Sequence, residues 1–396
     1  MNYRFSDKVT GLQASAIREI LKFTSLPQVI SFAAGNPAPE AFPSEQIGEI
    51  AAKIMSENPV AALQYSITEG YMPLRETMRK RLLFQNSYNP EIDDVIITSG
   101  GQQGNELACK VLLNEHETLI CESPSFTGSM TSFKSYNVNL VGVPCEDDGF
   151  DMAALENTLK YATNPKLIYV IPNFQNPTGT CMSLAKRKKL YELACAYDVM
   201  ILEDNPYGEI RFEGDNIPSV KSLDTEGRVI YVGSFSKVIA PGLRVGFVSA
   251  PKDIIQKMVV CKQVADVHTN IFAQIICNEF VNNYDFDGHL AKIREIYKKK
   301  YHLMISELEK NLPDSIKFTH PQGGLFLWGT LPDSVDMKLF CKTAVERNVA
   351  VVPGVAFLIN ENEKCNSFRV NYSTPSDENI IKGTKILGDV AREMLS

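Results

Sequence analysis

Residues 233–247 read GSFSKVIAPGLRVGF, and this run joins two short apolar segments, Val229–Val232 and Val245–Ser249. Near-continuous apolar segments of this length are typical of strands that are buried on both faces of a sheet. Five similar segments precede them: Val95–Thr98, Thr118–Cys121, Leu140–Val143, Leu167–Ile171 and Val199–Glu203. The chain is therefore predicted to contain a succession of seven buried strands.

Helical patterns separate several of these strands. After Ser183, a suitable N-cap, the apolar residues Leu190, Leu193, Ala194 and Tyr197 follow the spacing of one helix face. Strands that alternate with helices form right-handed crossovers and a mostly parallel sheet. We therefore predict an α/β fold whose large domain, residues 44–285, is built on a mostly parallel seven-stranded sheet.

The rest of the chain predicts a smaller C-terminal α/β domain, residues 286–396. A long helix over about 288–312 leads into it, and further helices are expected near 336–347 and 376–395. Its predicted strands are Gly324–Trp328, Val349–Val352 and Phe368–Tyr372. The three lysines 298–300 on the long helix are expected to form a solvated face. Residues 1–43 contain one amphipathic helix, about Leu12–Lys22, and a Gly/Pro-rich stretch.

The composition excludes several classes of protein. A hydrophobic content of 44% and a charged content of 22% indicate a folded globular chain, and the net charge of −7 disfavours a nucleic-acid or anionic membrane surface. We expect neither a signal peptide nor a transmembrane helix, because no apolar run is long enough. The nine scattered cysteines lack a C-x-x-C pair and predict reduced thiols in a cytoplasmic protein. The five histidines show no ligand spacing, so no metal site is expected.

Lys237 lies among small and hydroxyl-bearing residues, and Arg244 follows seven positions later. A lysine that forms a Schiff base must be neutral part of the time, with a pKa far below the usual value of about 10.4. Serine hydroxyls and a guanidinium are suited to binding phosphate. Together these residues indicate a lysine that holds a phosphorylated aldehyde, pyridoxal 5'-phosphate. A surface lysine in a polar turn is the ordinary alternative.

Two further motifs follow predicted strands, at the end where open α/β sheets bind ligands. The glycines of Thr98–Gly104 would let backbone N–H groups approach an anion at a helix N-terminus. The segment Glu122–Phe126 places an aromatic ring where it could stack on a heteroaromatic ring. A simple tight turn and a core phenylalanine are the alternatives.

Two more motifs complete this edge of the sheet. In Pro172–Gly179, Asn176 precedes a proline and is held extended, which can aim its amide into a cleft. Asp204 ends a buried apolar strand, where a carboxylate is costly unless a positive or hydrogen-bonding group meets it. A protonated pyridine nitrogen is such a partner. The alternatives are an ordinary turn at Asn176 and a helix cap at Asp204.

Each motif is weak alone, but their order along one βα framework is specific. From about Gly11 to the C-terminus, the sequence closely resembles the fold-type I pyridoxal-phosphate aminotransferases of class I/II. Within that class it is most similar to the 2-aminoadipate and kynurenine aminotransferase-like branch. The combination of Asn-Pro-Thr-Gly with Ser-Phe-Ser-Lys-x-x-x-Pro-Gly-x-Arg carries the resemblance. It is highly specific for fold and cofactor and much less specific for substrate.

The resemblance implies a role for each motif residue. Lys237 would hold the cofactor as an internal aldimine and later carry the proton between the substrate Cα and the cofactor. Asp204 would pair with the pyridine nitrogen, and Asn176 and Tyr207 would bond the ring's phenolic oxygen. Phe126 would stack on the ring. The residues expected to hold the phosphate are Gly101, Gln102, Ser234, Ser236 and Arg244.

The resemblance also implies the substrate contacts and a homodimer. Arg369 matches the arginine that clamps the substrate α-carboxylate, and Asn176 lies at the substrate side of the site. Gly35 and Arg18 belong to an N-terminal lid, residues 1–43, that packs with the small domain, and Arg18 would meet a side-chain carboxylate. Tyr65 would reach the phosphate of the neighbouring subunit, which implies a homodimer with shared active sites.

Two positions depart from the relatives. Phe126 stands where they tend to have tyrosine, which keeps the stacking and removes a hydroxyl. Ala34-Gly35-Asn36-Pro37 replaces Gly-Gly-Leu-Pro in the lid. Because the lid covers the substrate, this change leaves the side-chain specificity open.

The predicted function is that of an aminotransferase. It would move the amino group of an L-amino acid to a 2-oxo acid, 2-oxoglutarate, by a ping-pong route. The substrate would be 2-aminoadipate, an aromatic amino acid or a broad range. A pyridoxal-phosphate-dependent β-lyase on the same scaffold is the alternative enzyme. A cofactor-sensing transcription regulator is disfavoured because the chain is acidic and shows no DNA-binding motif, and a catalytically dead binding module because every expected cofactor residue type is present.

Overall fold

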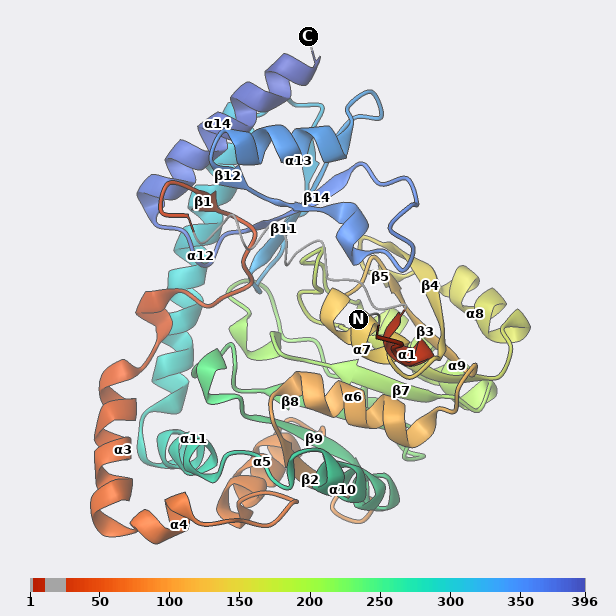
Figure 1. Ribbon diagram of the computed structural model, residues 1–396, viewed down its shortest axis with the longest axis vertical. Helices are drawn as coiled ribbons and strands as arrows, with labels where there is room; N and C mark the ends of the chain where they lie inside the picture. Colours follow the sequence, from red (N-terminus) through yellow and green to blue (C-terminus); the bar gives the residue numbers. More distant parts are fainter. Residues whose placement is uncertain (1–2, 11–25, 396) are drawn as a thin grey trace.

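The computed structural model describes residues 3–10 and 26–395 (Figure 1). The predicted helix over residues 12–22, with Arg18, lies outside the described residues. The large domain is built on an eight-stranded sheet with the order β2-β9-β8-β7-β6-β3-β4-β5. Its strands are β2 (Asp93–Thr98), β3 (Thr118–Ser123), β4 (Asn139–Glu146), β5 (Gly149–Phe150), β6 (Pro165–Val170), β7 (Met200–Asp204), β8 (Val229–Ser234) and β9 (Gly246–Pro251).

All seven predicted strands of this sheet are present, but the sheet has eight strands, one more than predicted. The additional strand, β5, has only two residues and pairs antiparallel with β4. Two residues are too few to produce a periodic pattern. Strands β3, β4, β6, β7 and β8 run parallel, whereas β9 is antiparallel to its neighbours β8 and β2. The sheet is therefore mostly parallel, as predicted.

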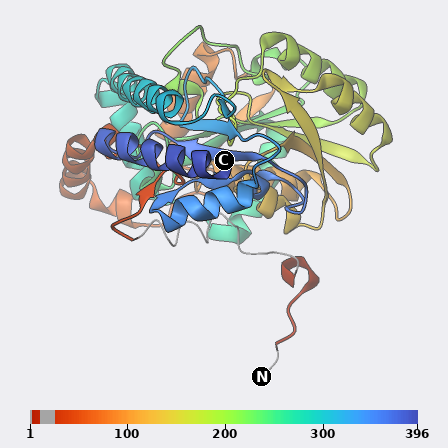
Figure 2. The ribbon, with the colours of Figure 1, turned by 90° about the horizontal axis from the view of Figure 1, so that it is seen from above.

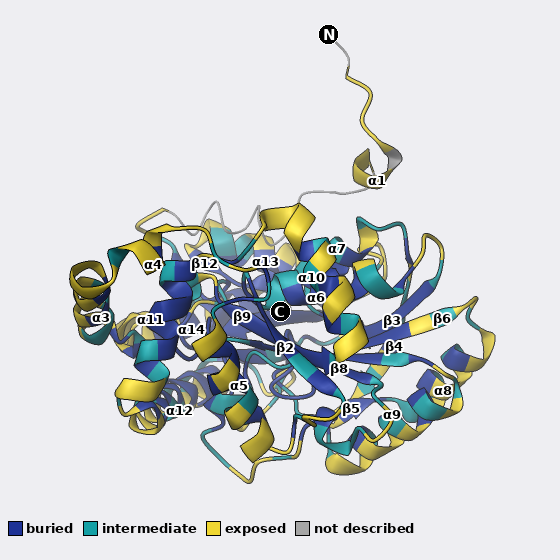
Figure 3. Ribbon diagram, turned by 90° about the horizontal axis from the view of Figure 1, so that it is seen from below, coloured by how far each residue is buried: buried dark blue, intermediate teal, exposed yellow. Residues whose placement is uncertain are grey.

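Helices cover both faces of the sheet, so its central strands are buried, whereas β4 near the edge is only partly buried and the prediction of a buried strand is wrong there (Figure 3). One face is covered by α6 (Gly101–Leu112), α7 (Thr127–Lys134) and α10 (Lys252–Asp266). The other face is covered by α5 (Met72–Phe84), α8 (Met152–Tyr161) and α9 (Leu184–Ala196). The predicted N-cap of α9 is confirmed, because the Ser183 hydroxyl accepts a hydrogen bond from the Lys186 backbone N–H.

The smaller C-terminal domain contains a four-stranded antiparallel sheet with the order β10-β11-β14-β13. These strands are β10 (Lys317–Phe318), β11 (Phe326–Thr330), β13 (Val352–Pro353) and β14 (Ser367–Asn371). Helices α13 (Met337–Glu346) and α14 (Asp377–Leu395) flank the sheet, and α14 packs along α12 (Phe286–Asn311), the long helix that connects the domains (Figures 1 and 2).

The predicted strand over 349–352 is divided in the structure. Its first half, β12 (Val349–Ala350), pairs in parallel with β1 (Ile30–Ser31) from the N-terminal part of the chain. Its second half is β13, which pairs with β14. One apolar run thus contributes a strand to each of two sheets, and the pairing of β1 with β12 joins the N-terminal segment to the small domain.

Four further α-helices and five 3-10 helices complete the described part of the chain. They are α1 (Asp7–Thr10), α3 (Ser44–Glu57), α4 (Pro59–Leu63), α11 (Ile271–Asn283), η1 (Pro39–Ala41), η2 (Gly208–Ile210), η3 (Lys221–Leu223), η4 (Pro241–Leu243) and η5 (Gly354–Phe357). Within residues 3–10 and 26–395, none of the helices qualifies as a membrane span.

The predicted solvated face of α12 is wrong for one of its three lysines. Lys299 is exposed, but Lys300 is buried. The Lys300 amine donates to the carbonyl of Pro375 at 2.8 Å and pairs with Glu40 at 3.0 Å. Lys300 follows Tyr297 by three positions and therefore lies on the inner face of the helix.

Candidate active site

A cavity of about 430 Å³ opens at the carboxyl ends of β7 and β8. We call it the Lys237 cavity. It brings together every predicted site residue of the described chain except Tyr65: Gly35, Gly101, Gln102, Phe126, Asn176, Asp204, Tyr207, Ser234, Ser236, Lys237, Arg244 and Arg369. The residues come from the loops after β2, β3, β6, β7 and β8, from β14 and from the segment after β1.

Lys237 lies in the turn that follows β8 and is partly buried. Its amine donates to the carbonyl of Gly35 at 2.8 Å. Burial, together with the positive charges of Arg369 and Arg244, lowers the pKa of Lys237 to about 8. A substantial share of the amine is therefore neutral and nucleophilic near physiological pH.

Asp204 is the last residue of β7 and is buried. Its Oδ2 accepts hydrogen bonds from the Asn105 amide at 2.7 Å and from the Tyr169 hydroxyl at 2.8 Å. Burial raises the pKa of Asp204 to about 6, and these two bonds oppose that rise. The carboxylate is thus ionised at neutral pH. The N-cap position of η2, the next helix, is occupied by Tyr207, so Asp204 does not serve as a helix cap.

Asn105 and Tyr169 were not predicted as site residues. Asn105 lies one helical turn after Gly101 on α6, so both face the cavity. That spacing was the available signal for Asn105. Tyr169 lies inside β6, where its sequence pattern is that of a core residue. Both side chains fix the orientation of the buried carboxylate.

The glycine turn forms a cradle for an anion. Helix α6 begins at Gly101 without a side-chain cap, so its first N–H groups are available to a ligand. Gly100 has φ +81°, and a Cβ there would lie 2.5 Å from a terminal nitrogen of Arg244. The Ser234 hydroxyl donates to the Ser236 hydroxyl at 3.0 Å on the adjoining turn. N–H groups, hydroxyls and a guanidinium are the donor set that a phosphate requires.

Arg369 extends from β14 into the cavity as a buried cation. It donates to the Asn176 side-chain oxygen and to the Ala33 carbonyl, both at 2.7 Å. The guanidinium carbon lies 4.2 Å from the Phe326 ring centroid and 4.8 Å from that of Phe357. Burial lowers its pKa to about 10, so it stays charged.

No carboxylate pairs with Arg369 among the described residues, and its Nε has no hydrogen-bond partner there. A buried cation of this kind is stabilised when an anionic ligand reaches it. The planar guanidinium suits the two oxygens of a carboxylate. The cavity therefore contains separate places for a phosphate and a carboxylate.

Tyr207 and Phe126 form the sides of the cavity. The Tyr207 hydroxyl bonds Asn176, and burial raises the pKa of Tyr207 well above its usual value, so the hydroxyl keeps its proton. Phe126 packs over Gly128, where a Cβ would lie 2.6 Å from the ring. This close approach positions the Phe126 ring beside the cavity.

Tyr65 does not lie in the Lys237 cavity of its own chain. Its side chain is 83% exposed and makes an edge contact with His268, with ring centroids 5.9 Å apart. Arg18, the other predicted site residue, lies outside the described residues. The geometry of this chain leaves both assignments as predictions.

Comparison with known proteins identifies the family. Residues 27–385 match the family model for aminotransferase class I and II. Aromatic-amino-acid aminotransferase 1 of Thermococcus litoralis is 41% identical, over 98% of this chain and 94% of that protein. The 2-aminoadipate transaminase of Thermus thermophilus is 39% identical, over 97% and 96%.

A solved structure supports the same family. A kynurenine aminotransferase of Pyrococcus horikoshii, in complex with PMP, superposes with a TM-score of 0.95 and 38% identity, covering 99% of this chain and 98% of that one. The donor set of the Lys237 cavity fits the group on which these enzymes depend. The chain therefore belongs to the class I and II aminotransferase family, whose cofactor is pyridoxal phosphate.

Proposed function

We propose that the chain transfers the α-amino group of an L-amino acid to 2-oxoglutarate in two half-reactions of a ping-pong cycle. One observation carries the proposal. A single cavity joins the partly neutral amine of Lys237, the buried carboxylate of Asp204 and the guanidinium of Arg369, which has no carboxylate partner among the described residues. These groups suit an aldehyde, a protonated ring nitrogen and a substrate carboxylate.

The proposed cofactor contacts follow from the same cavity. When bound, pyridoxal phosphate supplies an electron sink for the bonding electrons of the substrate Cα. Asp204 would hold a proton on the ring nitrogen, with Asn105 and Tyr169 fixing its carboxylate. Phe126 would cover one face of the ring, and Tyr207 with Asn176 would bond the ring oxygen. The proposed phosphate contacts are Gly101, Gln102, Ser234, Ser236 and Arg244.

Arg369 would bind the substrate, and Lys237 would transfer its proton. Arg369 would bind the α-carboxylate bidentately, since its charge is otherwise unpaired in the described site. Lys237 Nζ would accept the proton from Cα and then return it, because a pKa of about 8 suits a general base and acid near neutral pH. The Gly35 carbonyl holds Nζ in place at 2.8 Å.

We propose a broad substrate range that includes aromatic amino acids and 2-aminoadipate. The names of the two similar proteins support this range. Arg18, in the lid formed by residues 1–43 with Gly35, would meet a distal carboxylate. A dicarboxylate preference that is lost in Arg18→Ala, with aromatic substrates unaffected, would support the lid assignment.

We further propose a cytosolic homodimer with shared active sites. Tyr65 would reach the phosphate of the partner subunit. Its neighbours Val60, Leu63 and Ile67 are exposed apolar side chains, and clustered apolar surface of this kind marks interfaces. The nine cysteines are free, which supports a reducing compartment.

Half-transamination tests the proposed function. Phenylalanine, 2-aminoadipate and other L-amino acids are added to the cofactor-loaded enzyme without an acceptor. The expected result is loss of the absorption of the lysine-bound cofactor, one 2-oxo acid per site, and recovery when 2-oxoglutarate is added. Release of ammonia and pyruvate from a β-substituted amino acid, with no such spectral change, would instead identify a β-lyase.

A further inference from the structure

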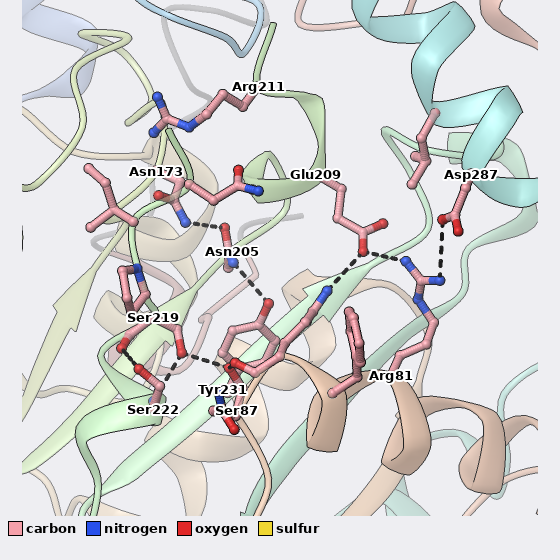
Figure 4. Close-up of a pocket in the computed structure, with 18 of the residues that line it drawn as sticks. Arg81, Ser87, Asn173, Asn205, Glu209, Arg211, Ser219, Ser222, Tyr231 and Asp287 are labelled. Carbon is pink, nitrogen blue, oxygen red and sulfur yellow. Dashed lines mark hydrogen bonds and ion pairs between the residues drawn. The ribbon is translucent and has the colours of Figure 1, made fainter. Parts of the chain in front are cut away.

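A second cleft, of about 980 Å³, lies between the end of α5, the loops after β6 and β7, and the first turns of α12 (Figure 4). We call it the α5–α12 cleft. Its lining shares no residue with that of the Lys237 cavity, although Asn205 directly follows Asp204 in sequence. The volume lies in the range of small-molecule sites. None of its residues has a role in the proposed transamination.

A ladder of neutral polar groups forms one wall of this cleft. The Asn173 amide donates to the Asn205 side-chain oxygen at 3.0 Å, and the Asn205 amide donates to the Tyr231 hydroxyl at 2.8 Å (Figure 4). Below them, the buried hydroxyls of Ser87 and Ser219 lie 2.7 Å apart. These bonds fix amides and hydroxyls in place along the cleft, where they can meet hydroxyl groups of a ligand.

The charges around the cleft favour an anion. Four cations line it against two carboxylates: Lys80, Arg81, Arg211 and Arg294 against Glu209 and Asp287. Both carboxylates face Arg81, at 2.6 Å and 4.0 Å. Lys80 and Arg294 have no carboxylate partner among the described residues. In a chain with a net charge of −7, this local excess of positive charge indicates an anionic ligand.

Phe84 supplies an aromatic surface at the rim. It is the last residue of α5, and its side chain is 91% exposed, more than any other large apolar residue of the described chain. It lies one turn after Lys80, so the ring and the amine share one side of the helix. A ring so placed can stack on a planar ligand.

We propose that the α5–α12 cleft binds a small anion that carries a planar ring and hydroxyl groups, as a nucleotide does. The ring stacks on Phe84, the hydroxyls contact the Asn173–Asn205–Tyr231 ladder, and the anionic group lies between Lys80 and Arg294. This site is independent of the proposed transamination.

Calorimetric titration of the holoenzyme with three probes tests the proposal. AMP carries ring, hydroxyls and phosphate, adenosine lacks the phosphate, and ribose 5-phosphate lacks the ring. AMP should bind tightest of the three. Phe84→Ala should weaken the binding of AMP about tenfold or more and leave the affinity for ribose 5-phosphate unchanged. The double variant Lys80→Gln, Arg294→Gln should weaken the binding of AMP and of ribose 5-phosphate but not the binding of adenosine.

Tyr161→Ala is the matched control, because Tyr161 is a 70% exposed ring at the end of α8 that does not line the cleft. It should leave the AMP affinity unchanged, and the absorption of the bound cofactor should stay constant during the titration. Absence of AMP binding at about 10 mM, equal weakening in the Phe84 and Tyr161 variants, or loss of the cofactor absorption would overturn the proposal.

Discussion

Replacing Arg369 with glutamine should raise the pKa of the Lys237 amine. In the cofactor-free enzyme this pKa is about 8, lowered first by burial and then by the charges of Arg369 and Arg244. At pH 7.5 a pKa near 8 leaves about a quarter of the amine neutral, against about 0.1% at an unshifted pKa. The fold thus increases the neutral amine about 200-fold.

Arg369→Gln removes one of the two positive charges and leaves the burial of Lys237 in place. The pKa should therefore move to a value between about 8 and 10.5. The neutral fraction at pH 7.5 then falls, because the amine is protonated at every pH below its pKa. Arg369→Lys is the matched control: it keeps the charge and should leave the pKa of Lys237 near 8.

The pKa is measured by NMR titration of the cofactor-free enzyme after reductive methylation with ¹³C-formaldehyde. The resonance of Lys237 is identified by its loss in Lys237→Ala. A midpoint near 10.5 in the wild type would refute the argument from burial. A wild-type midpoint near 8 that stays there in Arg369→Gln would refute the contribution of the guanidinium.

Further predictions concern stability, cofactor affinity and substrate binding. The buried Lys221 amine bonds Asp93 at 2.8 Å and Asp224 at 2.9 Å, so Lys221→Met should lower the free energy of unfolding in urea by about 3–5 kcal/mol. Lys189→Met, at an exposed ion pair, should change it by about 1 kcal/mol or less, and similar losses in both variants would contradict the role of burial. Gly100→Ala should weaken pyridoxal phosphate binding, followed by absorbance, about tenfold or more, because a Cβ meets Arg244 and φ is +81°. Gly242→Ala, where a Cβ would have open space around it, should have little effect. Equal affinity of both variants for pyridoxal phosphate would contradict the proposed role of Gly100 in the phosphate cradle. Arg369→Lys should reduce kcat/KM for the amino acid about 100-fold, or about 2.7 kcal/mol, since an ammonium cannot replace a bidentate guanidinium. An unchanged kcat/KM would exclude Arg369 from substrate binding.

The fold was predictable where burial leaves a continuous sequence pattern. The seven predicted strands of the large sheet contain near-continuous apolar runs because helices cover both faces of the sheet. β5 was missed because it has two residues, and the division between β12 and β13 was missed because one apolar run meets two partners. Lys300 was misplaced because three adjacent lysines read as a charged surface, although a helix places its third residue on another face.

The candidate site was predictable where its residues follow strand ends. Lys237, Asp204 and Asn176 stand in turns whose composition already indicates ligand chemistry. Asn105 and Tyr169 lie within a helix and a strand, so their contact with Asp204 appears only in three dimensions. The α5–α12 cleft was not predictable for the same reason, because its walls come from segments far apart in sequence.

The proposed function depends on Lys237 as the residue that binds the cofactor covalently. The holoenzyme is reduced with sodium borohydride, digested and analysed by mass spectrometry. We expect a phosphopyridoxyl group on the peptide that contains Lys237 and on no other peptide. The same group on a different lysine, or an unmodified Lys237 peptide from fully loaded enzyme, would contradict it.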